Sequence, residues 1–211
     1  MINSIHIQES LPAFQVMNQP WPEKIGHIAI IGASGSGKTT VLQAVRNAGF
    51  TVPKRYITRP TRLGDDLEEN VCVTKEEFAE LQAQGALGLV WQKNMEQDRV
   101  EQYGFAQSEA ELTILAGNNA LWKNREKVQP AGALRNTLWI KVVAPLEVRA
   151  ERLQKRSPDL FADKPEEAAF RVGESADELD VQMHLVLNNY GQFESEAAEQ
   201  LVKLITFLAS K

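Results

Sequence analysis

The sequence is poor in cysteine and carries no excess of positive charge. Its one cysteine, Cys72, cannot form an internal disulfide, and no set of residues with metal-ligand spacing accompanies it, as is typical of proteins in a reducing cytoplasm. The net charge of −5 argues against nucleic-acid binding, which relies on a broad basic face. No apolar run approaches the ~20 residues of a membrane span, and the N-terminus lacks the basic start and apolar run of a signal peptide. We therefore expect a cytoplasmic protein without a membrane or nucleic-acid partner.

The length of 211 residues suits one domain with a substantial core. Residues 1–25 contain Pro12, Pro20 and Pro22 and precede the first core strand. We therefore expect an N-terminal extension over residues 1–25 and a single domain over residues 26–211. The sequence leaves open whether the chain forms a homodimer.

The most informative feature is a glycine-rich loop between an apolar run and a helical segment. Its pattern G-x-x-x-x-G-K-T is that of a phosphate-binding loop, in which successive backbone N–H groups curl around a phosphate chain at the positive end of the following helix. Lys38 can reach the β- and γ-phosphates of a nucleotide, and the Thr39 hydroxyl can complete the ligand shell of Mg²⁺. The predicted nucleotide-binding residues are Gly32, Ala33, Ser34, Gly35, Ser36, Gly37, Lys38, Thr39 and Thr40.

Hydrophobic periodicity predicts strands that alternate with helices around this loop. A capping box at Thr74 predicts a helix that runs to about Gln84. Residues 108–117 predict a helix and residues 120–124 a buried strand, with a strand over residues 112–116 as the alternative. The other expected strands are residues 27–31, 50–58, 87–92, 99–103, 137–143 and 184–187, and the other expected helices are residues 39–48, 146–156, 166–179 and 194–209. This alternation predicts an α/β protein with a mostly parallel sheet and helices on both faces.

A basic cluster follows about twenty residues after the loop, with Lys54, Arg55, Arg59 and Arg62 within nine residues. The planar fork of arginine can hold a phosphate through two hydrogen bonds, so the cluster is a candidate site for a second phosphate group. Taken alone, such a cluster is more often a solvated surface loop.

The order of residues in this cluster resembles the acceptor-phosphate motif of the guanylate kinase superfamily. Residues 55–60 read R-Y-I-T-R-P, which is typical of the ribose 1,5-bisphosphate phosphokinase family. The resemblance continues across nearly all of residues 26–195, through the segments 69–71, 76–78, 89–91, 103–104, 152–156 and 187–189. It implies a P-loop kinase fold, an acceptor-binding region over about residues 53–106 and a mobile lid over about residues 153–171.

For the acceptor, the resemblance implies roles for four residues. Arg59 and Arg62 match arginines that hold the acceptor phosphate, and Arg55 opens the same motif. Tyr103 matches a tyrosine that contacts this phosphate as well.

For the donor, the resemblance implies that Arg152, Arg156 and Arg171 act with Lys38 as catalytic groups, as arginines of the lid and its flanks that close on the transferring phosphates. Asn188 lies in the segment that runs beside the base of ATP. Because Arg152 and Arg156 are four residues apart, they share one helical face, which like charges disfavour unless an anion lies there.

Departures from the family patterns bear on the acceptor. Val90 and Phe105 stand where guanylate kinases carry a glutamate and a serine that read guanine, and the missing partners would cost ~1–3 kcal/mol. GMP is therefore a poor candidate. Thr39 stands where many ribose 1,5-bisphosphate phosphokinases carry aspartate, and Ser157 replaces their usual lid glycine.

The resemblance implies an ATP- and Mg²⁺-dependent kinase that acts on a small phosphorylated substrate. We predict transfer of the γ-phosphoryl group to the 1-phosphate of ribose 1,5-bisphosphate, which gives 5-phosphoribosyl diphosphate. An acceptor phosphate is already anionic near neutral pH, so no general base is required. The alternatives are a guanylate kinase-like enzyme and a non-catalytic binding module, although the intact loop and lid arginines disfavour the latter.

Overall fold

The computed structural model describes residue 7 and residues 9–61, 70–94, 100–163, 165–173 and 182–210. The chain divides into two compact units. Unit 1 comprises Met1–Trp21, Ile30–Gly49 and Leu138–Lys211, and unit 2 comprises Pro22–Ala29 and Phe50–Thr137. In the described part of the chain, no helix is both long enough and apolar enough to cross a membrane.

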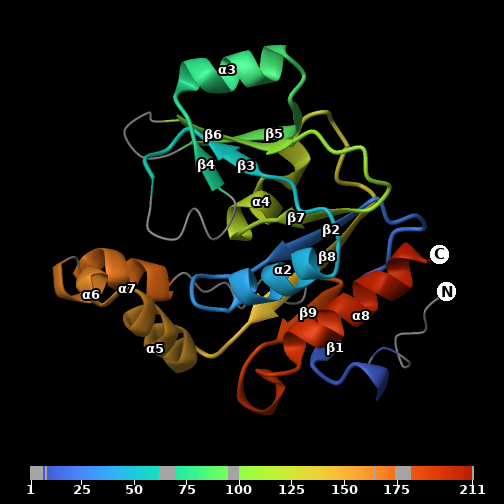
Figure 1. Cartoon of the computed structure of the whole chain (residues 1–211), viewed down its shortest axis with the longest axis vertical. Helices are drawn as coiled ribbons and strands as arrows, with labels where there is room; N and C mark the ends of the chain where they lie inside the picture. The colour runs from blue at the N-terminus through green and yellow to red at the C-terminus, as the bar shows by residue number, and fades with distance from the viewer. Residues whose placement is uncertain are drawn as a thin grey trace. The chain divides into compact units, whose positions relative to one another are not determined.

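A five-stranded sheet carries the phosphate-binding loop. Its strands are β1 (Phe14–Val16), β2 (His27–Ile31), β7 (Thr113–Ala116), β8 (Thr137–Val143) and β9 (Leu185–Asn188). Their order is β1-β9-β8-β2-β7, in which β8 and β9 run parallel and β1 and β9 antiparallel (Figure 1). Six of the seven residues of β8 are buried, as is typical of an inner strand covered on both faces. The predicted bounds of β8 are confirmed.

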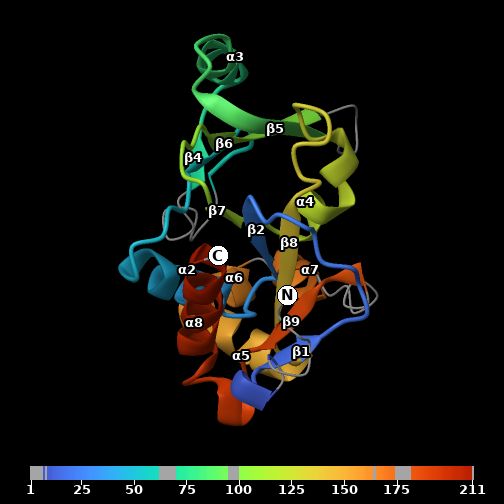
Figure 2. The same ribbon diagram turned by 90° about the vertical axis from the view of Figure 1, so that its right-hand side faces the viewer.

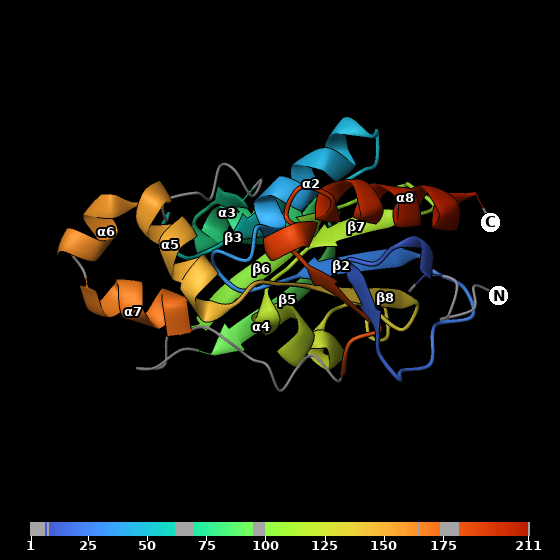
Figure 3. The same ribbon diagram turned by 90° about the horizontal axis from the view of Figure 1, so that it is seen from below.

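Two helices of unit 1, α2 (Lys38–Asn47) and α8 (Ala197–Ala209), pack against each other (Figure 3). The short 3₁₀ helix η4 (Gly191–Phe193) precedes α8. Both α2 and α8 are amphipathic and bury one apolar face, as the sequence pattern predicts. The buried apolar residues of these faces are Val41, Leu42, Val45, Ala197, Leu201, Leu204 and Ile205.

Three further helices of unit 1, α5 (Leu146–Arg156), α6 (Pro158–Asp163) and α7 (Pro165–Gly173), are in mutual contact (Figure 1). The bounds of α5 are those predicted. Proline opens both α6 and α7, a position where its fixed φ and missing N–H are tolerated. The predicted helix over residues 166–179 is confirmed as far as residue 173, and its remainder lies outside the described residues.

Part of the N-terminal segment adds a strand to the sheet. Phe14 pairs with Leu187 and Val16 with Leu185 in an antiparallel ladder between β1 and β9. The Phe14 side chain is buried, and the Ala13 N–H donates to Gln200 Oε1 in α8 at 2.8 Å. Ala13 and Phe14 therefore belong to the packed core of unit 1, whereas Gln15 is exposed.

Unit 2 contains a four-stranded sheet with a helix on one face (Figure 2). The strands, in the order β4-β3-β6-β5, are β4 (Asn70–Cys72), β3 (Arg55–Ile57), β6 (Val100–Ala106) and β5 (Leu87–Asn94), and the helix is α3 (Lys75–Ala83). The predicted capping box is confirmed: the Glu77 N–H donates to Thr74 Oγ1 at 3.1 Å, and the Thr74 N–H donates to Glu77 Oε2 at 2.7 Å. The buried Phe78 ring packs against Gly104 of β6, so α3 covers the face of the sheet on which Gly104 lies.

The predicted helix over residues 108–117 and strand over residues 120–124 are both wrong. Residues 113–116 form β7, the alternative considered above, and residues 119–123 form helix α4 (Asn119–Lys123), followed by the 3₁₀ helix η2 (Arg125–Lys127). All four residues of β7 are buried, so the run shows no polar alternation that would identify a strand. Asn118 caps α4, because its Oδ1 accepts from the Ala120 and Leu121 N–H groups at 3.1 and 3.3 Å.

The capping box of α3 predicts a measurable contribution to stability. We expect Thr74→Ala to lower the free energy of unfolding by about 1 kcal/mol, because it leaves the Glu77 N–H in the first turn without its side-chain partner. Urea unfolding followed by circular dichroism measures the change. The matched control is Thr51→Ala, at an exposed threonine whose hydroxyl makes no hydrogen bond to described residues. Equal losses in the two variants would show that the cap contributes nothing.

Candidate active site

The phosphate-binding loop joins the end of β2 to the start of α2, as predicted. Gly35 and Gly37 have φ of +80° and +86°, a left-handed conformation that side chains rarely adopt. A Cβ atom at Gly32 would lie 2.7 Å from Ser36 Oγ and 2.8 Å from the Val142 carbonyl oxygen. The loop is therefore folded too tightly for any residue but glycine at these positions.

Polar groups of the loop are withdrawn from solvent. Lys38 is 5% exposed and Ser36 is 1% exposed, whereas Thr39 is half-buried and Thr40 is exposed. The Ser36 hydroxyl has no hydrogen-bond partner among the described residues. Since buried polar groups ordinarily have partners, the hydroxyl is available to a group that the loop encloses.

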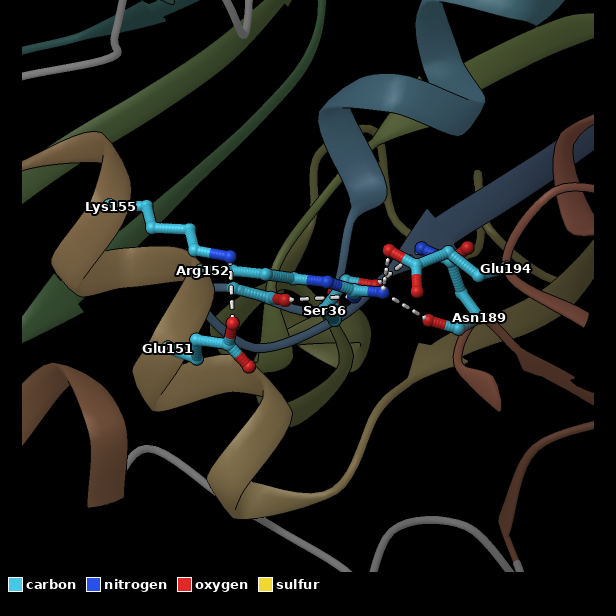
Figure 4. Close-up of polar contacts among 7 residues, drawn as sticks. Ser36, Glu151, Arg152, Lys155, Asn189 and Glu194 are labelled. Atoms are coloured by element: carbon cyan, nitrogen blue, oxygen red, sulfur yellow. Dashed lines mark hydrogen bonds and ion pairs between the residues drawn. The ribbon is translucent and has the colours of Figure 1, made fainter. Parts of the chain in front are cut away.

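Each carbonyl group from residue 33 to residue 37 accepts a hydrogen bond. The first and the last of these carbonyl groups accept from backbone N–H groups: the Ser36 N–H donates to Ala33 at 3.2 Å, and the Val41 N–H donates to Gly37 at 3.2 Å. Side chains from outside the loop serve the three between. These bonds are Arg149 Nε to Ser34 at 2.9 Å, Arg152 Nη1 to Gly35 at 3.3 Å and Asn189 Nδ2 to Ser36 at 2.8 Å. Figure 4 draws Arg152, Asn189 and Ser36.

Arg152 is tied to the protein at more than one point. Its Nη2 donates to the Asn189 carbonyl oxygen at 2.8 Å and pairs with Glu194 Oε1 at 2.8 Å (Figure 4). The other predicted lid arginines differ from it. Arg156 is exposed at the end of α5 and makes no hydrogen bond or ion pair to described residues, and for Arg171 only the backbone, in α7, is described.

Arg149, Asn189 and Glu194 were not among the predicted site residues. Arg149 precedes Arg152 by three residues and therefore shares its helical face. This spacing could have identified Arg149 as a site residue. Asn189 directly follows the predicted Asn188, which ends β9 half-buried with its N–H bonded to the Ala13 carbonyl at 2.9 Å. Of these two asparagines, Asn189 is the one that bonds the loop.

In unit 2, the predicted acceptor residues lie on or beside β3 and β6. Arg55 is 4% exposed; its Nε donates to Asn70 Oδ1 at 2.9 Å and its Nη1 to the Ala116 carbonyl oxygen at 3.0 Å. Arg59 is half-buried and donates to the carbonyl oxygen of Pro60 at 2.9 Å. Arg62 lies outside the described residues.

Tyr103 remains protonated at any physiological pH. Burial raises the pKa of its phenol, and the hydrogen bond to Glu101 Oε2, at 2.7 Å, raises it further, as does the negative charge of Glu101. The positive charges of Arg59 and Arg55 act in the opposite direction and are outweighed. The single phenol proton is directed to Glu101, so Tyr103 offers a bound phosphate a donor only by exchanging that partner.

The register of β5 and β6 separates the two residues that sequence reasoning placed against guanine. Val90 pairs with Gly104, whereas Leu89 pairs with Phe105 and Trp91 with Tyr103, so the Val90 side chain lies on the opposite face from Phe105. Val90 and Phe105 therefore cannot both face a ligand that lies on one side of this sheet. Phe105 is fully buried against Trp91, with ring centroids 5.4 Å apart, and Trp91 stacks on Tyr103 at 5.2 Å.

A cavity of about 560 Å³ lies along β5 and is lined by residues of α3, β5, β6 and the segment 124–129. Of the residues predicted to bind the acceptor, the three that the structure describes, Arg55, Arg59 and Tyr103, do not line it. In the described ranges, no group of three or more His, Cys, Asp or Glu residues is placed to hold a metal ion.

Comparisons with known proteins agree with this arrangement. The chain matches no protein-family model. It is similar to proteins named ribose 1,5-bisphosphate phosphokinase PhnN from Pseudofrankia inefficax, at 32% identity over 142 residues (64% of this chain, 70% of the relative), and from Chromobacterium violaceum, at 32% over 138 residues (61% and 68%). Guanylate kinase from Anaplasma phagocytophilum matches with a TM-score of 0.53 at 18% identity over 90% of this chain and 89% of its own. The predicted α/β P-loop kinase fold is confirmed.

The tight loop predicts that a methyl group at residue 37 weakens nucleotide binding. A Cβ there would overlap the Asn189 amide, and the left-handed backbone adds strain of ~1–2 kcal/mol. We expect Gly37→Ala to weaken ATP binding at least ten-fold, measured by titration calorimetry. Gly49→Ala is the matched control, because Gly49 has a φ of +89° with open space around it, and this variant should lose stability but keep its affinity. Unchanged affinity in Gly37→Ala would contradict the overlap.

Proposed function

The chain belongs to the ribose 1,5-bisphosphate phosphokinase family of phosphotransferases, and we propose that it transfers the γ-phosphoryl group of ATP to the 1-phosphate of ribose 1,5-bisphosphate. The product is 5-phosphoribosyl diphosphate. The observation that carries this proposal is the 32% identity to relatives of that name over about two thirds of the chain. Phe105 also favours it, because a buried aromatic side chain leaves a guanine base without a hydrogen-bond partner at this position.

The proposed donor site is the loop of unit 1. Its N–H groups and the buried ammonium group of Lys38 bind the β- and γ-phosphates, and the dipole of α2 adds positive potential at the same end. Phosphoryl transfer needs little covalent participation from the protein, so catalysis consists of positioning the phosphates and stabilising their charge. We assign to Lys38, which starts α2, the stabilisation of negative charge on the transferring group.

The proposed acceptor site is the β3–β6 part of unit 2. Arg59, together with Arg62, binds the 1-phosphate, and Tyr103 donates to it by exchanging its hydrogen bond to Glu101. Arg55 is buried and bonded to Asn70 and Ala116, so it supplies positive charge from within the sheet. Arg156 and Arg171 are proposed to close over the phosphates and exclude water, which limits hydrolysis of ATP.

Mg²⁺ is proposed to bind beside Thr39, whose hydroxyl is half-buried at the first turn of α2. When bound, the ion neutralises phosphate charge and orients the β- and γ-phosphates. Asn188 is proposed to border the base of ATP, at the end of β9 in unit 1.

Acceptor identity is tested by direct comparison of substrates. With ATP and Mg²⁺, we expect kcat/KM for ribose 1,5-bisphosphate to exceed that for GMP and for other mononucleotides, measured by formation of ADP and by phosphorus NMR of the product. Lys38→Ala is expected to lower kcat by ~10²–10³-fold with every acceptor. Faster turnover of GMP would replace the proposal by a guanylate kinase activity, and absence of both turnover and ATP binding would indicate a non-catalytic module.

The role of Arg59 predicts a selective effect on the acceptor. We expect Arg59→Ala to raise the KM for ribose 1,5-bisphosphate by roughly ten- to hundred-fold, because a charge-assisted hydrogen bond is lost, and to leave the KM for ATP unchanged. Steady-state kinetics with each substrate varied in turn gives both constants. Arg135→Ala, at an exposed arginine of the same unit, is the matched control. An unchanged acceptor KM in Arg59→Ala refutes the assignment.

A further inference from the structure

Three successive carbonyl groups of the phosphate loop depend on side chains that belong to α5 and to the end of β9. We propose that Arg149, Asn189 and the Arg152–Glu194 pair are positioning residues, which hold the loop in its phosphate-binding conformation without contacting the donor. We call this set the carbonyl brace. The inference rests on the proposed function, in which the loop binds ATP. In it, Arg152 acts by holding the loop and does not contact phosphate directly.

The loop requires such a constraint because of its composition. Residues 32–37 include three glycines, which have more backbone freedom than any other residue and lose more entropy when one conformation is fixed. The N–H groups can converge on a phosphate chain only while the carbonyl groups point away from it. Bonds to the carbonyl oxygens of Ser34, Gly35 and Ser36 therefore fix the orientation of the peptide units whose N–H groups face the phosphate.

Asn189 is itself held on both sides. Its N–H donates to the Val143 carbonyl at 2.9 Å, its own carbonyl accepts from Arg152 at 2.8 Å, and it is 5% exposed. Its amide Nδ2 therefore reaches Ser36 from a rigid position at the carboxyl ends of β8 and β9. The same amide fills the space beside Gly37 that a Cβ would need.

The Arg152 guanidinium serves three oxygens at once: the Gly35 and Asn189 carbonyls and the Glu194 carboxylate (Figure 4). Such an arrangement needs the planar fork of arginine, which lysine cannot reproduce. The Glu194 side chain is 59% exposed, so the ion pair adds little to the stability of the fold. The role of Glu194 is therefore to orient the Arg152 guanidinium.

Arg149 extends the brace to the neighbouring helices. It is 4% exposed, and while its Nε donates to Ser34, its Nη2 donates to the Val172 carbonyl oxygen of α7 at 2.8 Å. One side chain of α5 thus joins the loop to α7.

A matched pair of substitutions tests the proposal. Glu194→Gln and Glu151→Gln each remove one negative charge next to α5, but Glu194 pairs with Arg152 whereas Glu151 pairs with Lys155 at 2.7 Å on the solvent side (Figure 4). General electrostatics predicts that either change tightens binding of anionic ATP. The brace predicts that Glu194→Gln weakens ATP binding on the order of ten-fold, with Tm nearly unchanged, while Glu151→Gln does not weaken it.

Affinity for ATP is measured by titration calorimetry on the full chain without acceptor, and the KM values for ATP and acceptor are measured separately. Asn189→Ala and Arg152→Lys are expected to raise the Kd and KM for ATP and to leave the acceptor KM unchanged. Equal behaviour of Glu194→Gln and Glu151→Gln overturns the brace, as does a fall in Tm of Asn189→Ala with unchanged ATP affinity. If the unsubstituted chain binds no ATP, the proposed function itself fails; if it binds ATP but does not use ribose 1,5-bisphosphate, only the acceptor assignment fails.

Discussion

A backbone that turns successive N–H groups toward one anion turns its carbonyl groups the other way, and each of those carbonyl groups needs a donor. This constraint organises unit 1. The five carbonyl groups from residue 33 to residue 37 all have donors, of which two belong to the loop and α2 and three to side chains of α5 and residue 189. Because β8 and β9 run parallel, with Val143 opposite Asn188, both strands end beside the loop and bring Asn189 to it. The conformation of the loop therefore depends on the parallel pairing of β8 and β9.

In unit 2, the residues on and beside β3 and β6 are governed by a different constraint, which is the cost of burying charge within a small sheet. Arg55, Glu101 and Tyr103 are nearly inaccessible, and each has a polar partner on the same face of the sheet or beside it. Isolated buried charges would be costly, and here Arg55 donates to Asn70 and to the Ala116 carbonyl oxygen while Glu101 accepts from Tyr103. Arg59, at the end of the motif, is more exposed than they are. The proposed role of Arg59, which is to bind and release a doubly charged ligand, suits a more exposed position than those of the buried charges.

Local signals predicted much of the fold, and failed where the outcome depended on distant contacts. The apolar run of β8, the periodicity of α5 and the capping box of α3 each lie within a few residues, and their predicted bounds agree with the structure. β7 was predicted as a helix because a strand buried on both faces has no alternating pattern, and its pairing is invisible in the sequence. The glycine-rich loop was recognisable as a motif. The three side-chain donors to its carbonyl groups lie more than a hundred residues away in sequence, so the motif itself does not identify them.

The three arginines of α5 share one face of the helix but differ in burial, and this difference separates their roles. Arg149, Arg152 and Arg156 follow one another at intervals of three and four residues, so they share a face of the helix. Along this face, burial decreases from Arg149, at 4% exposure, through Arg152, whose side chain is 22% exposed, to the exposed Arg156. Because Arg152 and Arg156 carry like charges on one helical face, an anion is expected beside them. The Glu194 carboxylate is such an anion, and it pairs with Arg152. Arg152 has no need of a ligand to balance its charge, whereas Arg156 has no bonded partner among the described residues. Of these three, Arg156 is therefore the arginine whose position suits direct contact with phosphate.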